Sequence, residues 1–247
     1  MEHEQILTQA VGRLQSEGSR REFMRLAGLL GGAVALAACG KDNNPTAPRN
    51  PNVMLDFTKP VDVLKYAFAL ETLEADFYTK VAANGNFSTA FSSADERQIF
   101  TDIRDHEVAH REFFRAALGA NGGTVPALST QYPASVDFGN RASVLATAKV
   151  FEDLGVSAFN GAAKYLTANA TAIAFLGIAG KIVSIEARHA SAIRDLLSPN
   201  TANFANVSDI SAIGADESKG LDAKASPAIV LPMAQPFIKE TITFSGT

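Results

Sequence analysis

Two short segments of this 247-residue chain carry a glutamate and a histidine three positions apart. Glu107 and His110 lie in HEVAHREFF, and Glu186 and His189 lie in IEARHASAI. On a helix, side chains three residues apart share a face, so each pair points in one direction. Carboxylates and imidazoles presented together bind iron, manganese or zinc ions. Both segments are therefore candidate metal-binding sites.

The surrounding residues predict that both pairs face a protein core. Apolar residues recur at steps of three and four over residues 100–117 and again over residues 175–196, and each pair falls within its stripe. This period is typical of a helix with one buried face. Aligning the segments matches Glu107 with Glu186 and His110 with His189, which indicates an internal repeat.

Each pair is preceded by a second predicted helix with an inward carboxylate. Residues 145–166 form a stripe that contains Glu152, and LETLEADFY contains Glu71 and Glu74. The two helices also align, with Glu71 against Glu152 and Tyr78 against Phe159. This alignment favours Glu71 as the functional carboxylate of the first helix. The interval of 33 residues between Glu74 and Glu107 favours Glu74 instead.

The chain thus contains two copies of a helical hairpin that gives one Glu and then Glu-x-x-His. Ionised carboxylates in an apolar core are costly unless they are paired, protonated or bound to metal. Four carboxylates and two imidazoles can hold two cations, with carboxylates bridging the ions. The predicted ligands are Glu71, Glu107, His110, Glu152, Glu186 and His189, with Glu74 as the alternative to Glu71.

The helical periods predict an all-α fold built on four helices, at residues 59–83, 93–119, 140–168 and 170–197. SADE at residues 93–96 is a capping box that starts the second helix. Short connections join the first helix to the second and the third to the fourth. Residues 119–139 form a long connection between the second and the third. We therefore predict two hairpins joined by a long crossover, spanning residues 59–198, with an irregular tail at 199–247 packed on the bundle.

This arrangement resembles the ferritin-like di-iron and di-manganese carboxylate proteins, in which two helices give one Glu and two give Glu-x-x-His. Among these proteins, the segment LETLEADFY is similar to the sequences of bacterial ferritin-like proteins of the desiccation-related type. The resemblance implies two iron or manganese ions, bridged by Glu107 and Glu186, and dioxygen or peroxide as oxidant. An enzyme of this kind would be a ferroxidase, a peroxidase or a catalase. The alternative is a non-enzymatic stress-protection or metal-storage protein of the envelope.

The start of the chain predicts export. SRREFMR at residues 19–25 precedes a 13-residue apolar run and LAAC, which ends at Cys39. The first segment resembles a twin-arginine signal, and the second resembles the box of a bacterial lipoprotein. We expect a signal peptide at 1–38, lipidation and membrane anchoring at Cys39, and a flexible linker at 39–58. The protein would then face the periplasm or the exterior of a bacterial cell envelope.

The composition of the chain argues against several other classes of protein. The formal net charge is −4 and the basic residues are scattered, so nucleic-acid binding is not predicted. The single cysteine excludes an internal disulfide framework and a cysteine-based zinc cluster. An anchored N-terminus and the added tail argue against a closed ferritin-type cage, but the oligomeric state stays open.

HEVAH at residues 106–110 also fits the H-E-x-x-H pattern of zinc peptidases. Such a site needs both histidines and a third ligand downstream, and the extended pattern fails at Phe113 and Ala116. The repeat has Ile185 where His106 stands, so only Glu-x-x-His recurs. We therefore interpret His106 as a residue at the surface or behind the ligands, and Tyr78 as a core aromatic with a satisfied hydroxyl.

Overall fold

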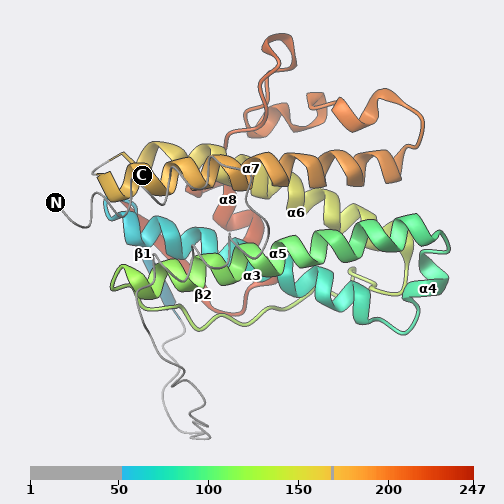
Figure 1. Ribbon diagram of the computed structural model, residues 1–247, viewed down its shortest axis with the longest axis horizontal. Coiled ribbons are helices and arrows are strands. Elements are labelled where there is room, and N and C mark those ends of the chain that lie inside the picture. Colours follow the sequence, from blue (N-terminus) through green and yellow to red (C-terminus); the bar gives the residue numbers. More distant parts are fainter. Residues whose placement is uncertain (1–51, 168–169) are drawn as a thin grey trace, which may run out of the picture.

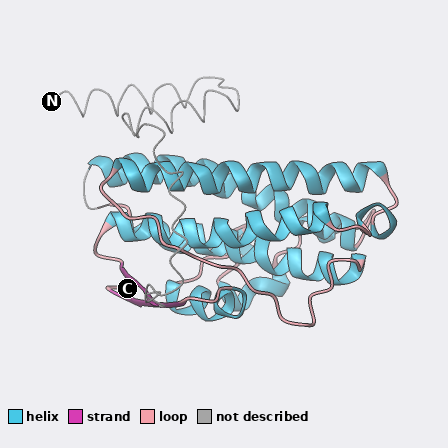
Figure 2. Ribbon diagram, turned by 90° about the horizontal axis from the view of Figure 1, so that it is seen from below, coloured by secondary structure: helices cyan, strands magenta, loops and turns pink. Residues whose placement is uncertain are grey.

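Four long helices lie side by side in the computed structural model, which describes residues 52–167 and 170–247 (Figures 1 and 2). They are α3 (Pro60–Ala83), α5 (Ala94–Ala120), α6 (Arg141–Ala162) and α7 (Ala170–Leu197). A short helix, α4 (Phe87–Ala90), lies in the turn of the first hairpin. The predicted all-α bundle is confirmed, and three of its helices begin and end close to the predicted positions. The third, predicted to run to residue 168, ends at Ala162 and is followed by the 3-10 helix η1 (Ala163–Tyr165).

Local sequence signals explain where these helices begin. Pro60 occupies the first turn of α3, where its missing N–H is not needed. The side chain of Ser93 accepts a hydrogen bond from the Glu96 N–H, and α6 starts similarly with Asn140 as its cap. The Glu96 carboxylate pairs with Arg141 (2.5 Å), so it links the start of α5 to the start of α6.

The crossover between α5 and α6 runs without a helix or strand but is tied to α3. Asp76 accepts hydrogen bonds from the hydroxyls of Thr130 (2.6 Å) and Tyr132 (2.8 Å). Asp76 also pairs with Lys80 one turn later on α3. A connection of this length is uncommon without secondary structure, and these contacts hold it against the bundle.

The part after α7 is a chain of short elements. They are η2 (Ala202–Ala205), η3 (Ser208–Ile213), η4 (Glu217–Lys219), α8 (Pro227–Ala234), η5 (Gln235–Phe237) and β2 (Thr241–Ser245). Arg194 of α7 forms a buried ion pair with Asp153 of α6, and it also contacts the more exposed Asp209 of η3. The sequence predicted an irregular tail packed on the bundle here.

A two-stranded parallel sheet joins the two ends of the described chain. Strand β1 (Asn52–Asp56) pairs with β2 in a register that sets Asn52 opposite Thr241, and Leu55 is fully buried. Residues 52–56 are therefore a strand, whereas the sequence analysis placed them in a flexible linker at 39–58. The pairing joins segments far apart in the chain, so no local pattern signals it. The expected signal peptide, Cys39 and the rest of the linker lie outside the described residues.

The tail crosses α6 at its closest point beside Gly161. The Ala225 N–H donates to the carbonyl of Ser157 (3.0 Å), and Ala225 is fully buried. A Cβ atom added at Gly161 would lie 1.7 Å from the Ala225 carbonyl oxygen. Only glycine lets these two backbones approach this closely.

Substituting this glycine should separate the tail from the bundle. We expect Gly161→Ala to lower the free energy of unfolding by about 3 kcal/mol, the upper range for an overpacked core. The exposed Gly177 of α7 is a matched control, since a Cβ there meets nothing within 4 Å. Gly177→Ala should raise stability by up to about 1 kcal/mol, because alanine favours helices. Urea denaturation of both variants measures the difference, and equal stabilities would contradict this packing.

Candidate metal centre

The acidic and imidazole side chains of the repeat meet inside the bundle. All four helices contribute, and the six predicted ligands are between 0% and 6% exposed. In each Glu-x-x-His pair the two side chains lie one turn apart on the buried face, as their spacing predicted. The described residues form two groups able to hold a metal ion. The first half-site consists of Glu71, Glu107, His110 and Glu186, and the second of Glu107, Glu152, Glu186 and His189.

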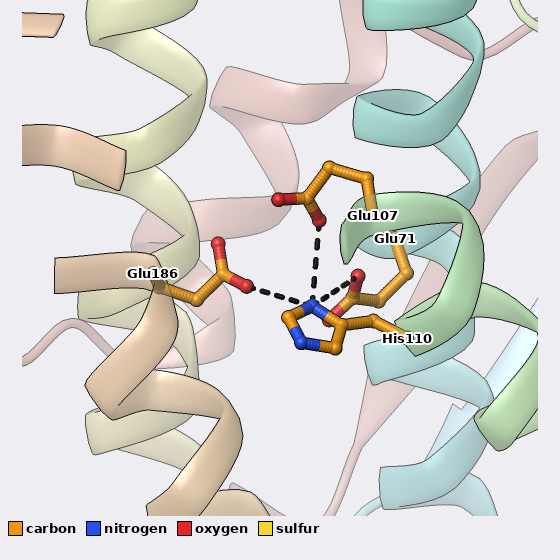
Figure 3. A group of neighbouring side chains, drawn as sticks. All are labelled: Glu71, Glu107, His110 and Glu186. Carbon is orange, nitrogen blue, oxygen red and sulfur yellow. Dashed lines mark ion pairs between the residues drawn. The ribbon is translucent and has the colours of Figure 1, made fainter. Parts of the chain in front are cut away.

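The first half-site is arranged around the Nδ1 atom of His110 (Figure 3). This nitrogen lies 3.4 Å from Oε2 of Glu71, 3.6 Å from Oε2 of Glu107 and 3.0 Å from Oε1 of Glu186. The three carboxylates come from three different helices. The imidazole and the carboxylates therefore converge on one small volume.

The second half-site repeats this arrangement around His189. Its Nδ1 atom lies 2.7 Å from Oε1 of Glu107 and 3.4 Å from Oε2 of Glu152. Glu107 therefore turns one oxygen toward each histidine, and Glu186 belongs to both groups. A carboxylate with one oxygen in each half-site has the position of a bridge between two ions.

The ligand atoms face one another without forming ordinary hydrogen bonds. Among the described residues, no hydrogen-bond partner exists for either histidine Nδ1, for either oxygen of Glu71, Glu107 or Glu186, or for Oε2 of Glu152. Buried polar atoms are normally hydrogen-bonded. These atoms are close together but not aligned as donors and acceptors, which is how ligands around a cation are arranged. The site therefore fits a pair of cations.

The family to which the fold belongs agrees with the chemistry of the site. A family model of the ferritin-like domain matches residues 59–199, more than half of the chain. The chain belongs to the ferritin-like family. No curated protein gives a significant match to it. The family confirms the ferritin-like bundle, and the buried cluster is compatible with the two-metal site that this fold carries.

Electrostatics in the ferritin-like bundle reflect the crowding of acidic groups. Burial raises the pKa of Glu71 and Glu186, and it raises the pKa of Glu152 to about 8. Burial also disfavours ionised Glu107, but His189 and His110 outweigh this and hold its pKa well below the usual range. Without metal, the cluster therefore keeps protons that carboxylates in water would release.

Glu74 lies beside the ligand cluster but belongs to neither half-site. It is 3% exposed, and its Oε2 atom has no hydrogen-bond partner among the described residues. A Cβ atom added at Gly155 would lie 2.8 Å from Oε1 of Glu74 and 3.2 Å from Oε2 of Glu186. Gly155 thus makes room for Glu74, and the structure brings Glu71, not Glu74, against His110.

Two further residues contact the ligands from outside. The hydroxyl of Tyr78, which is fully buried, donates a hydrogen bond to Oε1 of Glu152. His106 is half-buried, and its Nδ1 atom lies 2.9 Å from Nε2 of His189. His106 therefore reaches the back of a ligand and joins neither half-site, so the H-E-x-x-H set is not assembled as a zinc site. The sequence predicted a core position with a satisfied hydroxyl for Tyr78 and a position at the surface or behind the ligands for His106, but not which ligand each one contacts.

Stability of the metal-free protein should fall as the pH rises from about 5 to 8. Glu71, Glu152 and Glu186 have folded-state pKa values above their usual 4.5, so over this range the folded protein holds protons that the unfolded chain has released. The raised pKa values of His110 and His189 act in the same direction above 6.5.

Urea denaturation of chelator-treated protein at pH 5 and pH 8 measures this trend. Glu107 does not contribute to the change, because its lowered pKa leaves it ionised in both states over this range. Bound Mn(II) should reverse the slope, since ligands must lose protons to bind metal. Greater stability at pH 8 than at pH 5 in the metal-free protein would contradict the prediction.

Proposed function

We propose that this protein holds two iron or manganese ions in the bundle and uses them to oxidise ferrous iron or to reduce dioxygen or peroxide. The observation that carries this proposal is the convergence of four carboxylates and two imidazoles, whose atoms facing one another lack hydrogen-bond partners among the described residues. Two divalent ions would balance the charges of four ionised carboxylates. Oxygen and nitrogen ligands of this kind suit iron and manganese.

The chain's own residues supply the positions of the ions and their protection from water. When bound, iron or manganese ions would supply the electrons that reduce the oxidant. In this centre His110 and His189 would each hold one ion, and Glu107 and Glu186, which belong to both half-sites, would hold both. The five buried glutamates are at most 3% exposed, so bulk water does not compete for the ligand atoms. Tyr78 holds Glu152 in place through its hydroxyl.

A small, mostly apolar cavity is consistent with dioxygen as the oxidant. It has a volume of about 20 Å³ and lies toward one end of the bundle, lined by side chains that include Ala67, Phe114 and Phe159. Ala67 is one helical turn from Glu71, and Phe114 is one turn from His110, so two lining residues lie on the same helices as ligands of the first half-site. Small apolar cavities stay dry and accept apolar molecules such as xenon. Dioxygen is apolar, whereas hydrogen peroxide is not.

We further propose that the protein is exported and anchored to the envelope through a lipid on Cys39. The support is the twin-arginine-like SRREFMR followed by the lipoprotein-like LAAC. Mass spectrometry of the N-terminus of the mature protein tests this, with a lipidated Cys39 as the expected first residue. A mature chain that retains Met1, or one with an unmodified Cys39, would contradict it.

Metal content is the primary test. After anaerobic reconstitution with Fe(II) or Mn(II), we expect close to two ions per chain in the wild type, because each half-site has its own histidine. The double variant His110→Ala, His189→Ala should lose both ions, and its circular dichroism should show that the bundle is retained. Metal-free wild-type protein after reconstitution would overturn the proposed centre.

Oxidant titration separates an enzyme from a storage or structural protein. If the centre turns over, protein loaded with Fe(II) under anaerobic conditions should consume dioxygen when excess Fe(II) and dioxygen are then supplied, and the double variant should consume it no faster than buffer alone. The storage alternative is supported by the complete burial of Glu71, Glu107, Glu152 and Glu186. Metal-replete protein that consumes neither dioxygen nor peroxide would favour that alternative.

The first-helix ligand can be tested by a matched pair of variants. Glu71→Gln should weaken binding of one ion by about 10-fold or more, since the Glu71 carboxylate faces His110. Glu74→Gln keeps the shape of a side chain outside both half-sites, so the protein should still bind two ions. Calorimetric titration with Mn(II) compares them. Loss of an ion in Glu74→Gln but not in Glu71→Gln would reverse the assignment.

A further inference from the structure

We propose that the two half-sites are unequal, and that His106 and Tyr78 are positioning residues that make the second half-site bind its ion more tightly than the first. This inference rests on the proposed two-metal centre. It concerns residues that are not themselves ligands, and it follows from where the two copies of the repeated hairpin differ.

The contact between His106 and His189 has the geometry of an in-plane hydrogen bond. The Nδ1 atom of His106 lies 2.9 Å from Nε2 of His189. The ring centroids are 5.2 Å apart and the ring planes differ by 14°. A nitrogen–nitrogen distance this short at this centroid separation means that the rings meet edge to edge in nearly one plane. The ring lone pair then points along the hydrogen bond.

The direction of this hydrogen bond follows from the ligand role of His189. Its Nδ1 atom faces Glu107 and Glu152, so Nδ1 is the atom that would bind a metal. A neutral imidazole that binds through Nδ1 carries its proton on Nε2. The Nε2–H group therefore donates to Nδ1 of His106. By accepting this bond, His106 fixes both the tautomer of His189 and the orientation of its ring.

Tyr78 does the same for the carboxylate of that half-site. Its hydroxyl donates to Oε1 of Glu152, while Oε2 of Glu152 faces His189. One oxygen of Glu152 is thus held from behind and the other is presented to the ion. Such outer hydrogen bonds orient ligands, and losing one commonly weakens metal binding 10- to 100-fold.

The repeat supplies neither partner to the first half-site. The position equivalent to Tyr78 is Phe159, which has no hydroxyl, and the position equivalent to His106 is Ile185, which can neither donate nor accept a hydrogen bond. Both polar residues therefore serve Glu152 and His189. Glu71 and His110 receive no equivalent hydrogen bond from these two positions.

A stepwise titration with Co(II) tests the inference. The metal-free wild type should bind two ions in separate steps, and visible absorption should report the ligands at each step. His106→Phe keeps a flat ring but removes the accepting nitrogen, so it should weaken the tighter step 10- to 100-fold and change its spectrum. The weaker step should stay the same. Tyr78→Phe should also weaken the tighter step.

His106→Asn is the matched control, because its side-chain oxygen can accept the hydrogen bond from His189. It should restore most of the affinity lost in His106→Phe, which a role in packing alone would not explain. Two equal steps in the wild type, or unchanged steps in both His106→Phe and Tyr78→Phe, would overturn the inference while leaving the metal centre intact. A wild type that binds no Co(II), Fe(II) or Mn(II) would instead overturn the centre itself, and the inference with it.

Discussion

The structure depends on the burial of five glutamates and two histidines in the interior of an apolar bundle. Ionised carboxylates in such an interior are costly unless opposite charge is close. The two histidines offset only part of this charge, so the metal-free cluster retains protons, and the pKa of Glu152 rises to about 8. Cations would remove the need for those protons. Metal binding would therefore be coupled to bundle stability, because all four helices supply the charges.

The rest of the fold holds these four helices in place around the cluster. The buried pair of Arg194 and Asp153 joins α7 to α6 beside the ligands, since Asp153 directly follows Glu152. Asp76 of α3 secures the crossover that separates the two hairpins. The tail packs against α6 at Gly161, and β2 pairs with β1 just before α3 begins. These contacts lie outside the ligand cluster, but each restrains a helix that contributes to it.

Much of the bundle and of its candidate site could be predicted from the sequence, because the helical spacing of apolar residues identifies both the helices and their buried faces. The steps of three and four placed Glu107, His110, Glu186 and His189 on buried faces, and the structure brings these side chains together. The pairing of β1 with β2 could not be predicted, because it joins distant segments with no local signal. Helical period also could not separate Glu71 from Glu74, since both lie on the inward face of α3 and only the neighbouring helices distinguish them.

The positions at which the two copies of the hairpin carry different residues show where the surroundings of the two half-sites differ. Glu74 is aligned with Gly155, and the missing side chain of Gly155 leaves the space that the Glu74 carboxylate occupies. Tyr78 and His106 are aligned with Phe159 and Ile185, and both polar members contact ligands of one half-site. A duplicated hairpin alone would give two equivalent metal positions. Each of these differences changes what lies behind a ligand and leaves the ligands themselves in place. The proposed centre would therefore hold two ions in the same set of atoms and bind them with different affinities.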